Sequence, residues 1–174
     1  MTCLEQRLLE FDGKAVSCLS EAKAACGAGA GYLDDLVRLC FDRRPLVSSG
    51  ATWILKAELE AGNRLGDSQR GEIVQALHRI TSCQAALHLL QVADLLDLSA
   101  AEGSDVADWA GQYADHPRPF LRAWSLHSRV TLAHRFAGPG VDVQELLANA
   151  AEDEAASVRA RAGKLRKALK LPEG

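Results

Sequence analysis

One long helical segment, 119–136, constrains the fold of this chain more than any other stretch. Pro117 and Pro119 precede it, and a helix can begin at or just after the second proline. At about 100° per residue, its apolar side chains form two flanks separated by polar stripes: Leu121, Trp124 and Leu132 on one, and Ala123, Leu126, Val130 and Ala133 on the other. A helix with two apolar flanks packs against neighbours on both sides, as the inner helix of a stacked helical repeat does.

The rest of the composition predicts an all-α protein. The chain is rich in Ala and Leu, only 5% of its residues are aromatic, and Ile and Thr are scarce. Because β-branched and aromatic residues are what sheets prefer, their scarcity argues against a sheet. The length of 174 residues suits a core of good size, and no gap between helical segments is long enough for a linker. We therefore expect one domain spanning 1–174.

Short Gly, Pro or Asp breaks divide the chain into ten helical segments. The predicted pairs are about 3–11 with 13–26, 32–41 with 44–61, 67–80 with 83–98, 104–114 with 119–136, and 142–151 with 154–170.

The pairs read as copies of one unit. Asp42, Asp115 and Asp153 each fall in the tight turn inside a pair, and Thr81 takes that place in the third pair. These positions recur about every 34 to 39 residues, the period of a helical repeat.

The turns carry a resemblance to a known family. A turn Asp is followed by a hydrophobic residue and an Arg at the start of the second helix, as Asp115 with Leu121-Arg122 and Asp153 with Val158-Arg159. This pattern resembles the HEAT-type helical repeat. The resemblance covers nearly the whole chain, although the first two pairs lack the Arg. It implies a right-handed α-solenoid of about five antiparallel helix pairs and implies no chemistry.

The last pair supports this interpretation. One flank of its second helix stays apolar, whereas Ala160, Gly163, Lys167 and Lys170 form a small and polar flank. A terminal repeat has a neighbour on one side only, so we expect this flank to be exposed and the stack to end near Lys170.

A basic stripe is the candidate binding site. Arg122 and Arg129 lie on one face of 119–136, and Arg159 and Arg166 occupy the same positions one repeat later. Under one interpretation, Arg122 and Arg159 form an inter-repeat ladder with turn aspartates and carbonyl groups. Under the other, all four side chains receive an acidic segment or phosphates of a partner. Arg129 and Arg166, two turns into their helices, are the stronger partner candidates.

Catalytic and metal-binding motifs are missing from the sequence. His127 and His134 share a polar stripe with Thr131, but two helical turns, about 10 Å, separate the histidines, too far to chelate one metal unaided. There is no phosphate-binding loop, nucleophile elbow or Cys/His arrangement. We expect no enzyme activity, no cofactor and no metal site.

The cysteines and the start of the chain bear on location. Five cysteines without a Cys-x-x-Cys pair read as small buried hydrophobes in a reducing compartment. The start reads as a capping box from Thr2 to Glu5 rather than a signal sequence, and no apolar run is long enough to span a membrane. We expect a cytoplasmic monomer without membrane contact.

These features favour a non-enzymatic scaffold or adaptor that binds a partner protein, with or without an acidic segment, on the concave face of the stack. The alternative is a nucleic-acid or DNA-repair protein similar to the HEAT-like alkylpurine DNA glycosylases, which work above a basic groove. The formal net charge of −3 argues against nucleic acid. A lyase or chaperone-like repeat protein that acts on a bound chromophore or subunit has the same sequence features.

Overall fold

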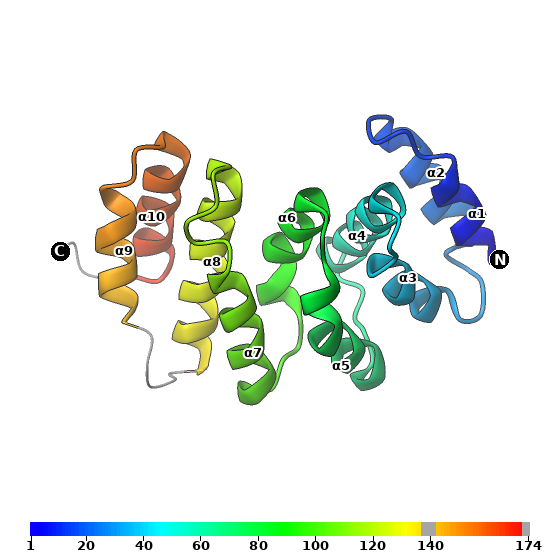
Figure 1. Ribbon diagram of the computed structural model, residues 1–174. Coiled ribbons are helices and arrows are strands. Elements are labelled where there is room, and N and C mark those ends of the chain that lie inside the picture. Colours follow the sequence, from blue (N-terminus) through cyan, green and yellow to red (C-terminus); the bar gives the residue numbers. More distant parts are fainter. Residues whose placement is uncertain (137–141, 172–174) are drawn as a thin grey trace. The chain divides into compact units, whose positions relative to one another are not determined.

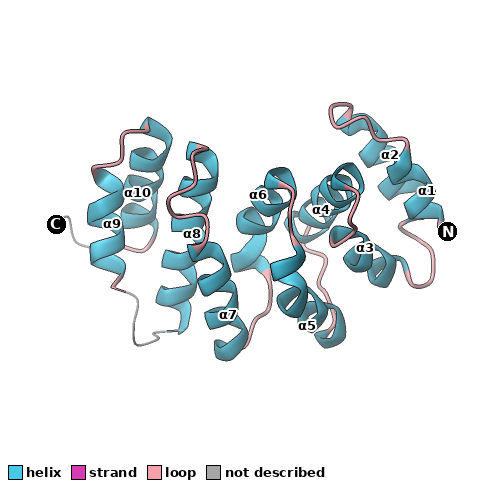
Figure 2. Cartoon of the chain, in the orientation of Figure 1, coloured by secondary structure: helices cyan, strands magenta, loops and turns pink. Residues whose placement is uncertain are grey.

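The computed structural model describes residues 1–136 and 142–171, and within these ranges the regular structure is helical, without a strand (Figure 2). The prediction of an all-α fold is confirmed. The α-helices of the described residues are α1 (Cys3–Leu9), α2 (Val16–Cys26), α3 (Tyr32–Cys40), α4 (Pro45–Glu60), α5 (Asp67–Ala76), α6 (Cys83–Val92), α7 (Ala100–Gly111), α8 (Pro119–Phe136), α9 (Val143–Ala151) and α10 (Ala156–Ala168) (Figure 1).

Helix ends differ from the sequence prediction in the middle of the chain. After α5 and α6 the backbone tightens into short 3₁₀ turns, Leu77–Arg79 and Ala93–Leu95, so both α-helices end earlier than expected. Helix α7 begins at Ala100 rather than 104. The reason is a capping box: the Ser99 hydroxyl accepts from the Glu102 amide, and the Glu102 carboxylate accepts from the Ser99 amide.

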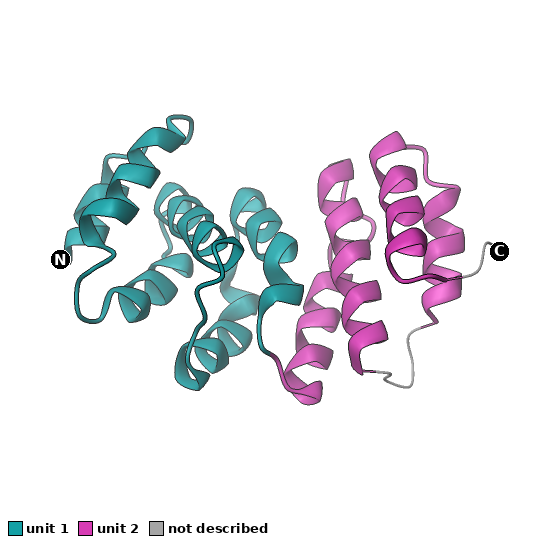
Figure 3. Cartoon of the chain, turned by 180° about the vertical axis from the view of Figure 1, so that it is seen from behind, with its two compact units in different colours: residues 1–97 teal, residues 98–174 magenta. Residues whose placement is uncertain are grey.

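The chain divides into two compact units, a first unit of residues 1–97 and a second unit of residues 98–174 (Figure 3). The single domain expected from the sequence stays a prediction.

Helix α4 is the centre of the first unit. It packs against α1, α2, α3 and α6, and its middle is buried on most sides. Gly50 makes this close approach possible, because a Cβ at that position would lie 2.8 Å from Leu8 Cδ2 and 3.1 Å from Leu19 Cδ2. The side chains of Leu8 and Leu19 are fully buried there, so α1 and α2 both sit directly on the α4 backbone.

An arginine also joins the first two helix pairs. The Arg44 guanidinium donates to both Asp42 carboxylate oxygens, at 2.8 and 2.6 Å, and to Glu5 Oε1 of α1 at 2.7 Å. The same hydrogen bonds lower the pKa of Glu5 and of Asp42 below their ordinary values. The turn residue Asp42 therefore has an arginine partner, although the first unit lacks the hydrophobic-Arg pair of the repeat pattern. The partner is Arg44, two residues after Asp42 in the same turn.

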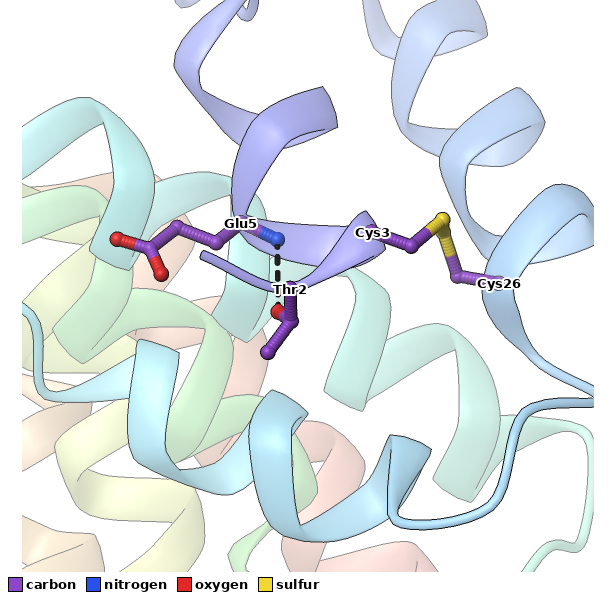
Figure 4. The surroundings of a disulfide bond; sticks show 4 residues. All are labelled: Thr2, Cys3, Glu5 and Cys26. Atoms are coloured by element: carbon purple, nitrogen blue, oxygen red, sulfur yellow. Dashed lines mark hydrogen bonds between the residues drawn. A yellow bond between two sulfur atoms is a disulfide. The ribbon is translucent and has the colours of Figure 1, made fainter.

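A disulfide corrects the prediction for the cysteines. Cys3 in the first turn of α1 and Cys26 at the end of α2 are bonded, with a Cα–Cα distance of 6.2 Å (Figure 4). The two residues meet because α1 and α2 pack together. Figure 4 also shows the Thr2 hydroxyl that accepts from the Glu5 amide, half of the expected capping box. The cytoplasmic location stays a prediction.

Helix α8 is the centre of the second unit and packs against α7, α9 and α10. Its two apolar flanks are buried at Leu121 and Leu132 on one side and at Ala123, Leu126 and Val130 on the other. The second flank forms one cluster with Leu147 and Ala150 of α9 and with Val158, Ala162 and Leu165 of α10.

The polar flank of α10 is exposed as expected: Ala160, Gly163, Lys167 and Lys170 all face solvent. Trp109 of α7 is buried and meets Tyr113 edge-on, with ring centroids 5.3 Å apart.

Candidate functional site

Arg122 is committed to the turn of the following helix pair. Its Nε and Nη2 donate to the two carboxylate oxygens of Asp153, at 3.0 and 2.8 Å, and its Nη1 donates to the carbonyl oxygen of His116 at 2.9 Å. This two-bond geometry is the strong form of an Arg–carboxylate contact. It raises the pKa of Arg122 and lowers the pKa of Asp153. Arg122 therefore has the contact with a turn aspartate that the sequence predicts, while an inter-repeat ladder stays a prediction.

Arg159 is also occupied, within its own turn. Its Nη1 donates to the carbonyl oxygens of Asp153 and Glu154, at 2.6 and 2.8 Å. Arg166 lies farther along α10 and reaches Gln144 Oε1 of α9 at 3.3 Å, a long contact. Of the four predicted arginines, Arg122 and Arg159 therefore form hydrogen bonds with turn residues.

Arg129 faces a cleft of about 450 Å³ whose lining comes from α7, α8, α9, α10 and the turns inside the two helix pairs. Within the described residues, its guanidinium has no hydrogen-bond or ion-pair partner. The charged side chains that line the cleft are Arg122, Arg129, Asp115 and Asp153. Because two positive charges meet two negative ones, the cleft as a whole does not favour an anionic segment.

A different surface of the second unit combines aromatic and cationic groups. The Arg161 guanidinium of α10 lies over the Trp124 ring of α8, 3.7 Å from its centroid, and the His127 ring meets Trp124 edge-on at 4.9 Å. Phe120, one turn earlier on α8, is 65% exposed. At about 100° per residue, Phe120, Trp124 and His127 lie on the side of α8 opposite Arg122.

Two further cations extend this surface. Arg135 near the end of α8 and Lys164 of α10 are exposed and fall on the same sides of their helices as Trp124 and Arg161. We call the set of Phe120, Trp124, His127, Arg135, Arg161 and Lys164 the basic–aromatic face. Burial against the ring lowers the pKa of Arg161, but an arginine stays charged at neutral pH.

Charge in the second unit is segregated by helix. Helices α8 and α10, which lie side by side (Figure 1), carry eight Arg and Lys residues and no Asp or Glu: Arg122, Arg129, Arg135, Arg159, Arg161, Lys164, Arg166 and Lys167. Helices α7 and α9 carry Glu102, Asp105, Asp108 and Glu145 and no Arg or Lys. The cations of these four helices that do not bond to turn residues therefore all lie on α8 and α10.

The sequence did not predict this surface, because the candidate arginines Arg122 and Arg129 lie on the opposite side of α8. Trp124 was expected to pack into the core, and it is instead half-buried beneath Arg161. The repeat alignment could have indicated this contact. Trp124 follows Leu121 by three positions, Arg161 follows the aligned Val158 by three positions, and equivalent positions on neighbouring second helices lie close together.

The described residues contain no group of three or more His, Cys, Asp or Glu side chains placed to hold a metal ion. No helix among them is long and apolar enough to cross a membrane.

Comparisons of the chain with protein-family models, with curated proteins and with solved structures found no match.

Proposed function

We propose that this protein is a non-enzymatic binding protein, a scaffold or adaptor, and that its basic–aromatic face takes an acidic segment of a partner protein. The observation that carries the proposal is the Arg161–Trp124 stack on two helices that hold only positive charges. A guanidinium held flat on a ring keeps its N–H edges free to meet a carboxylate. Phe120 beside it offers apolar surface for a neighbouring side chain of the same segment.

A short acidic segment suits this surface better than a nucleic acid. The cationic stretch is limited to α8 and α10, and α10 with 13 residues is about 20 Å long. A long polyanion would run past it into the carboxylates of α7 and α9, on a chain of net charge −3. A segment of a few acidic residues ends before it meets those carboxylates.

We also infer that the helix pairs are HEAT-like repeats of an α-solenoid. In the second unit, the Arg122–Asp153 contact joins two consecutive pairs in the manner that the resemblance implies. In such repeats the second helix of each pair lines the concave face. The basic–aromatic face, on α8 and α10, would then belong to it.

The test compares two lysines three residues apart on α10. Lys164 belongs to the basic–aromatic face and Lys167 does not, yet both are exposed and carry the same charge. We expect Lys164→Glu to weaken binding of a short fluorescein-labelled Glu- and Asp-rich peptide about five- to tenfold, measured by fluorescence anisotropy, because attraction becomes repulsion. Lys167→Glu should weaken it about twofold or less. Added salt should weaken the wild-type complex.

The other outcomes are informative. Equal losses in the two variants would show that the peptide senses net charge alone and would end the proposal. Tighter binding of a labelled oligonucleotide than of the peptide would favour the nucleic-acid alternative.

The predicted arginine stripe is tested in the same titration. Arg129 and Arg166 stay predictions as partner-contacting residues, and both lie away from the basic–aromatic face. If Arg129→Glu with Arg166→Glu reduces peptide binding more than Lys164→Glu does, the partner uses the cleft side of α8 instead.

A further inference from the structure

The first unit contains a pocket that no part of the proposed function uses. It has a volume of about 210 Å³ and lies where α2, α4 and α6 meet the loop before α2. Its walls are apolar at Phe11, Val16, Leu46 and Trp53, and its polar side chains are those of Ser49, Gln84 and His88. No Asp, Glu, Lys or Arg of the described residues lines it, so a charged ligand has no counterpart there.

The rim of this pocket is exposed apolar surface. Val16 and Leu46 are each 49% exposed, two of the few large hydrophobic side chains that the described residues leave in water. Apolar side chains grouped around a pocket are typical of a contact site. A volume near 210 Å³ is smaller than the roughly 300–1,000 Å³ of drug-sized ligand sites. It suits one large side chain rather than a cofactor.

A chain of hydrogen bonds sets which polar atom the pocket offers. Thr52 Oγ1 lies 2.9 Å from the Ser48 carbonyl oxygen and 3.1 Å from that of Ser49, so we assign the only proton of the hydroxyl to these acceptors. Its oxygen can then only accept from His88 Nδ1, 3.0 Å away. His88 Nδ1 therefore carries the proton, and the neutral ring leaves Nε2 as an acceptor.

The last member of this chain is Gln84. Because His88 Nε2 accepts, the group 2.9 Å from it must be the Gln84 amide nitrogen. Burial of His88, together with the charge of Lys56, lowers the pKa of His88 to about 4, so this arrangement holds at neutral pH. The Gln84 amide is thus oriented, and its Oε1 is an acceptor to which no described residue donates. The other polar side chain of the lining, Ser49, already pairs its Oγ with Ser82 Oγ at 2.8 Å.

We propose that this pocket binds a tryptophan side chain of a partner protein, with the indole ring between Leu46 and Trp53 and the indole N–H donating to Gln84 Oε1. Tryptophan joins a large apolar area to a single donor, which matches apolar walls with one oriented acceptor. Aromatic anchors in such pockets dominate many protein interfaces. This site lies in the first unit and does not depend on the acidic-segment site of the second.

The experiment uses N-acetyltryptophanamide and its indole-N-methylated analogue as probes of the full ¹⁵N-labelled chain. We expect saturable shifts of the Trp53 indole signal and of amides around Leu46. The methylated analogue should bind about two- to tenfold more weakly, since it loses one neutral hydrogen bond. In Gln84→Leu the two probes should bind equally, whereas the ring contacts remain.

Leu46→Asp places a charge at the rim and should abolish the shifts. Leu9→Asp is its matched control, because Leu9 is 47% exposed but lies outside the pocket, and it should bind as the wild type does. Unfolding curves of both variants report that the fold is kept.

Three results would overturn the proposal. The first is the absence of saturable shifts, or shifts that survive Leu46→Asp. The second is equal binding of the two probes by the wild type, which removes Gln84 Oε1 as the acceptor. The third is binding of free indole without binding of N-acetyltryptophanamide, which assigns the pocket to a free small molecule.

Discussion

The two compact units are both made of short helices, but they place their polar groups differently. In the first unit, polar side chains are buried and bonded to one another: the Tyr32 hydroxyl donates to Glu58, and Thr52 pairs with His88. Its helices α1 to α5 each carry charges of both signs, and α6 carries no Asp, Glu, Lys or Arg. In the second unit the main hydrogen-bonded pair connects Arg122 of α8 with Asp153 in the turn before α10, and the cations and carboxylates that lie within α7 to α10 are on different helices.

The comparison teaches that the same architecture can be sensitive to different conditions. Buried hydrogen bonds to a titratable ring and a disulfide make the first unit dependent on pH and on reductant. Sorted surface charge makes the second unit dependent on salt and on charge substitutions. Each of the following predictions separates the units on one of these grounds.

The largest effect is expected in the second unit, from Val130→Asp. Val130 is fully buried in the cluster of α8, α9 and α10, where a carboxylate has no partner. The substitution should lower the free energy of unfolding by about 3 kcal/mol or more, or prevent folding of 98–174. Lys167→Asp, at the aligned position of α10, faces solvent and should unfold almost as the wild type does. Thermal unfolding followed by circular dichroism measures both, and similar losses in the two variants would refute the repeat alignment.

Reduction of the disulfide should act on the first unit alone. Cys3 and Cys26 are 23 residues apart, and opening a loop of that size costs about 2–4 kcal/mol of stability. Hydrogen exchange should therefore quicken in residues 1–97 of Cys3→Ser with Cys26→Ser and stay unchanged in 98–174. Cys18→Ser, which removes a thiol outside the bridge, serves as the control. Equal quickening in both units would mean that they unfold as one.

A smaller loss is expected when the pH falls from 7 to 4. Unfolded His88 takes up a proton near pH 6.5, but in the folded chain burial and the charge of Lys56 lower its pKa to about 4. A hydrogen bond to the Ser49 backbone and the charge of Glu60 offset this shift only in part. Between these values the unfolded state binds more protons, so stability is complete above pH 6.5 and falls by up to about 3 kcal/mol towards pH 4. Urea unfolding across this range should show a shallower pH dependence in His88→Gln than in the wild type. His134→Gln, at an exposed histidine of the second unit, is the control for the loss of a histidine as such.

The sequence predicted the helices and the turn contact of Arg122 because both follow from local periodicity. Apolar spacing along 119–136 placed the buried flanks of α8, and the recurrence of turn aspartates pointed to the partner of Arg122. The sequence did not predict the early ends of α5 and α6. A short 3₁₀ turn follows each helix, and its apolar spacing is similar to that of an α-helix.

Features that depend on packing between helices were not predictable in this way. The pairing of Cys3 with Cys26 requires knowing that α1 and α2 bring their far ends together, and five cysteines allow many pairings. The Arg161–Trp124 stack requires the distance between α8 and α10. The acceptor at Gln84 depends on three side chains from α4 and α6, which no spacing in the sequence connects.

The sorting of charge among α7 to α10 has a consequence for how a partner arrives. With cations on α8 and α10 and carboxylates on α7 and α9, we expect the second unit to have an electric dipole moment, although residues 98–174 carry ten Arg and Lys against ten Asp and Glu. In the field of an approaching anionic partner, such a body experiences a torque as well as an attraction. It turns its cationic side forward before any contact forms, so a larger share of collisions is productive. The sorted charges would then act on the association rate, by orienting the protein before contact. The contacts of the binding surface would set the dissociation rate of the complex.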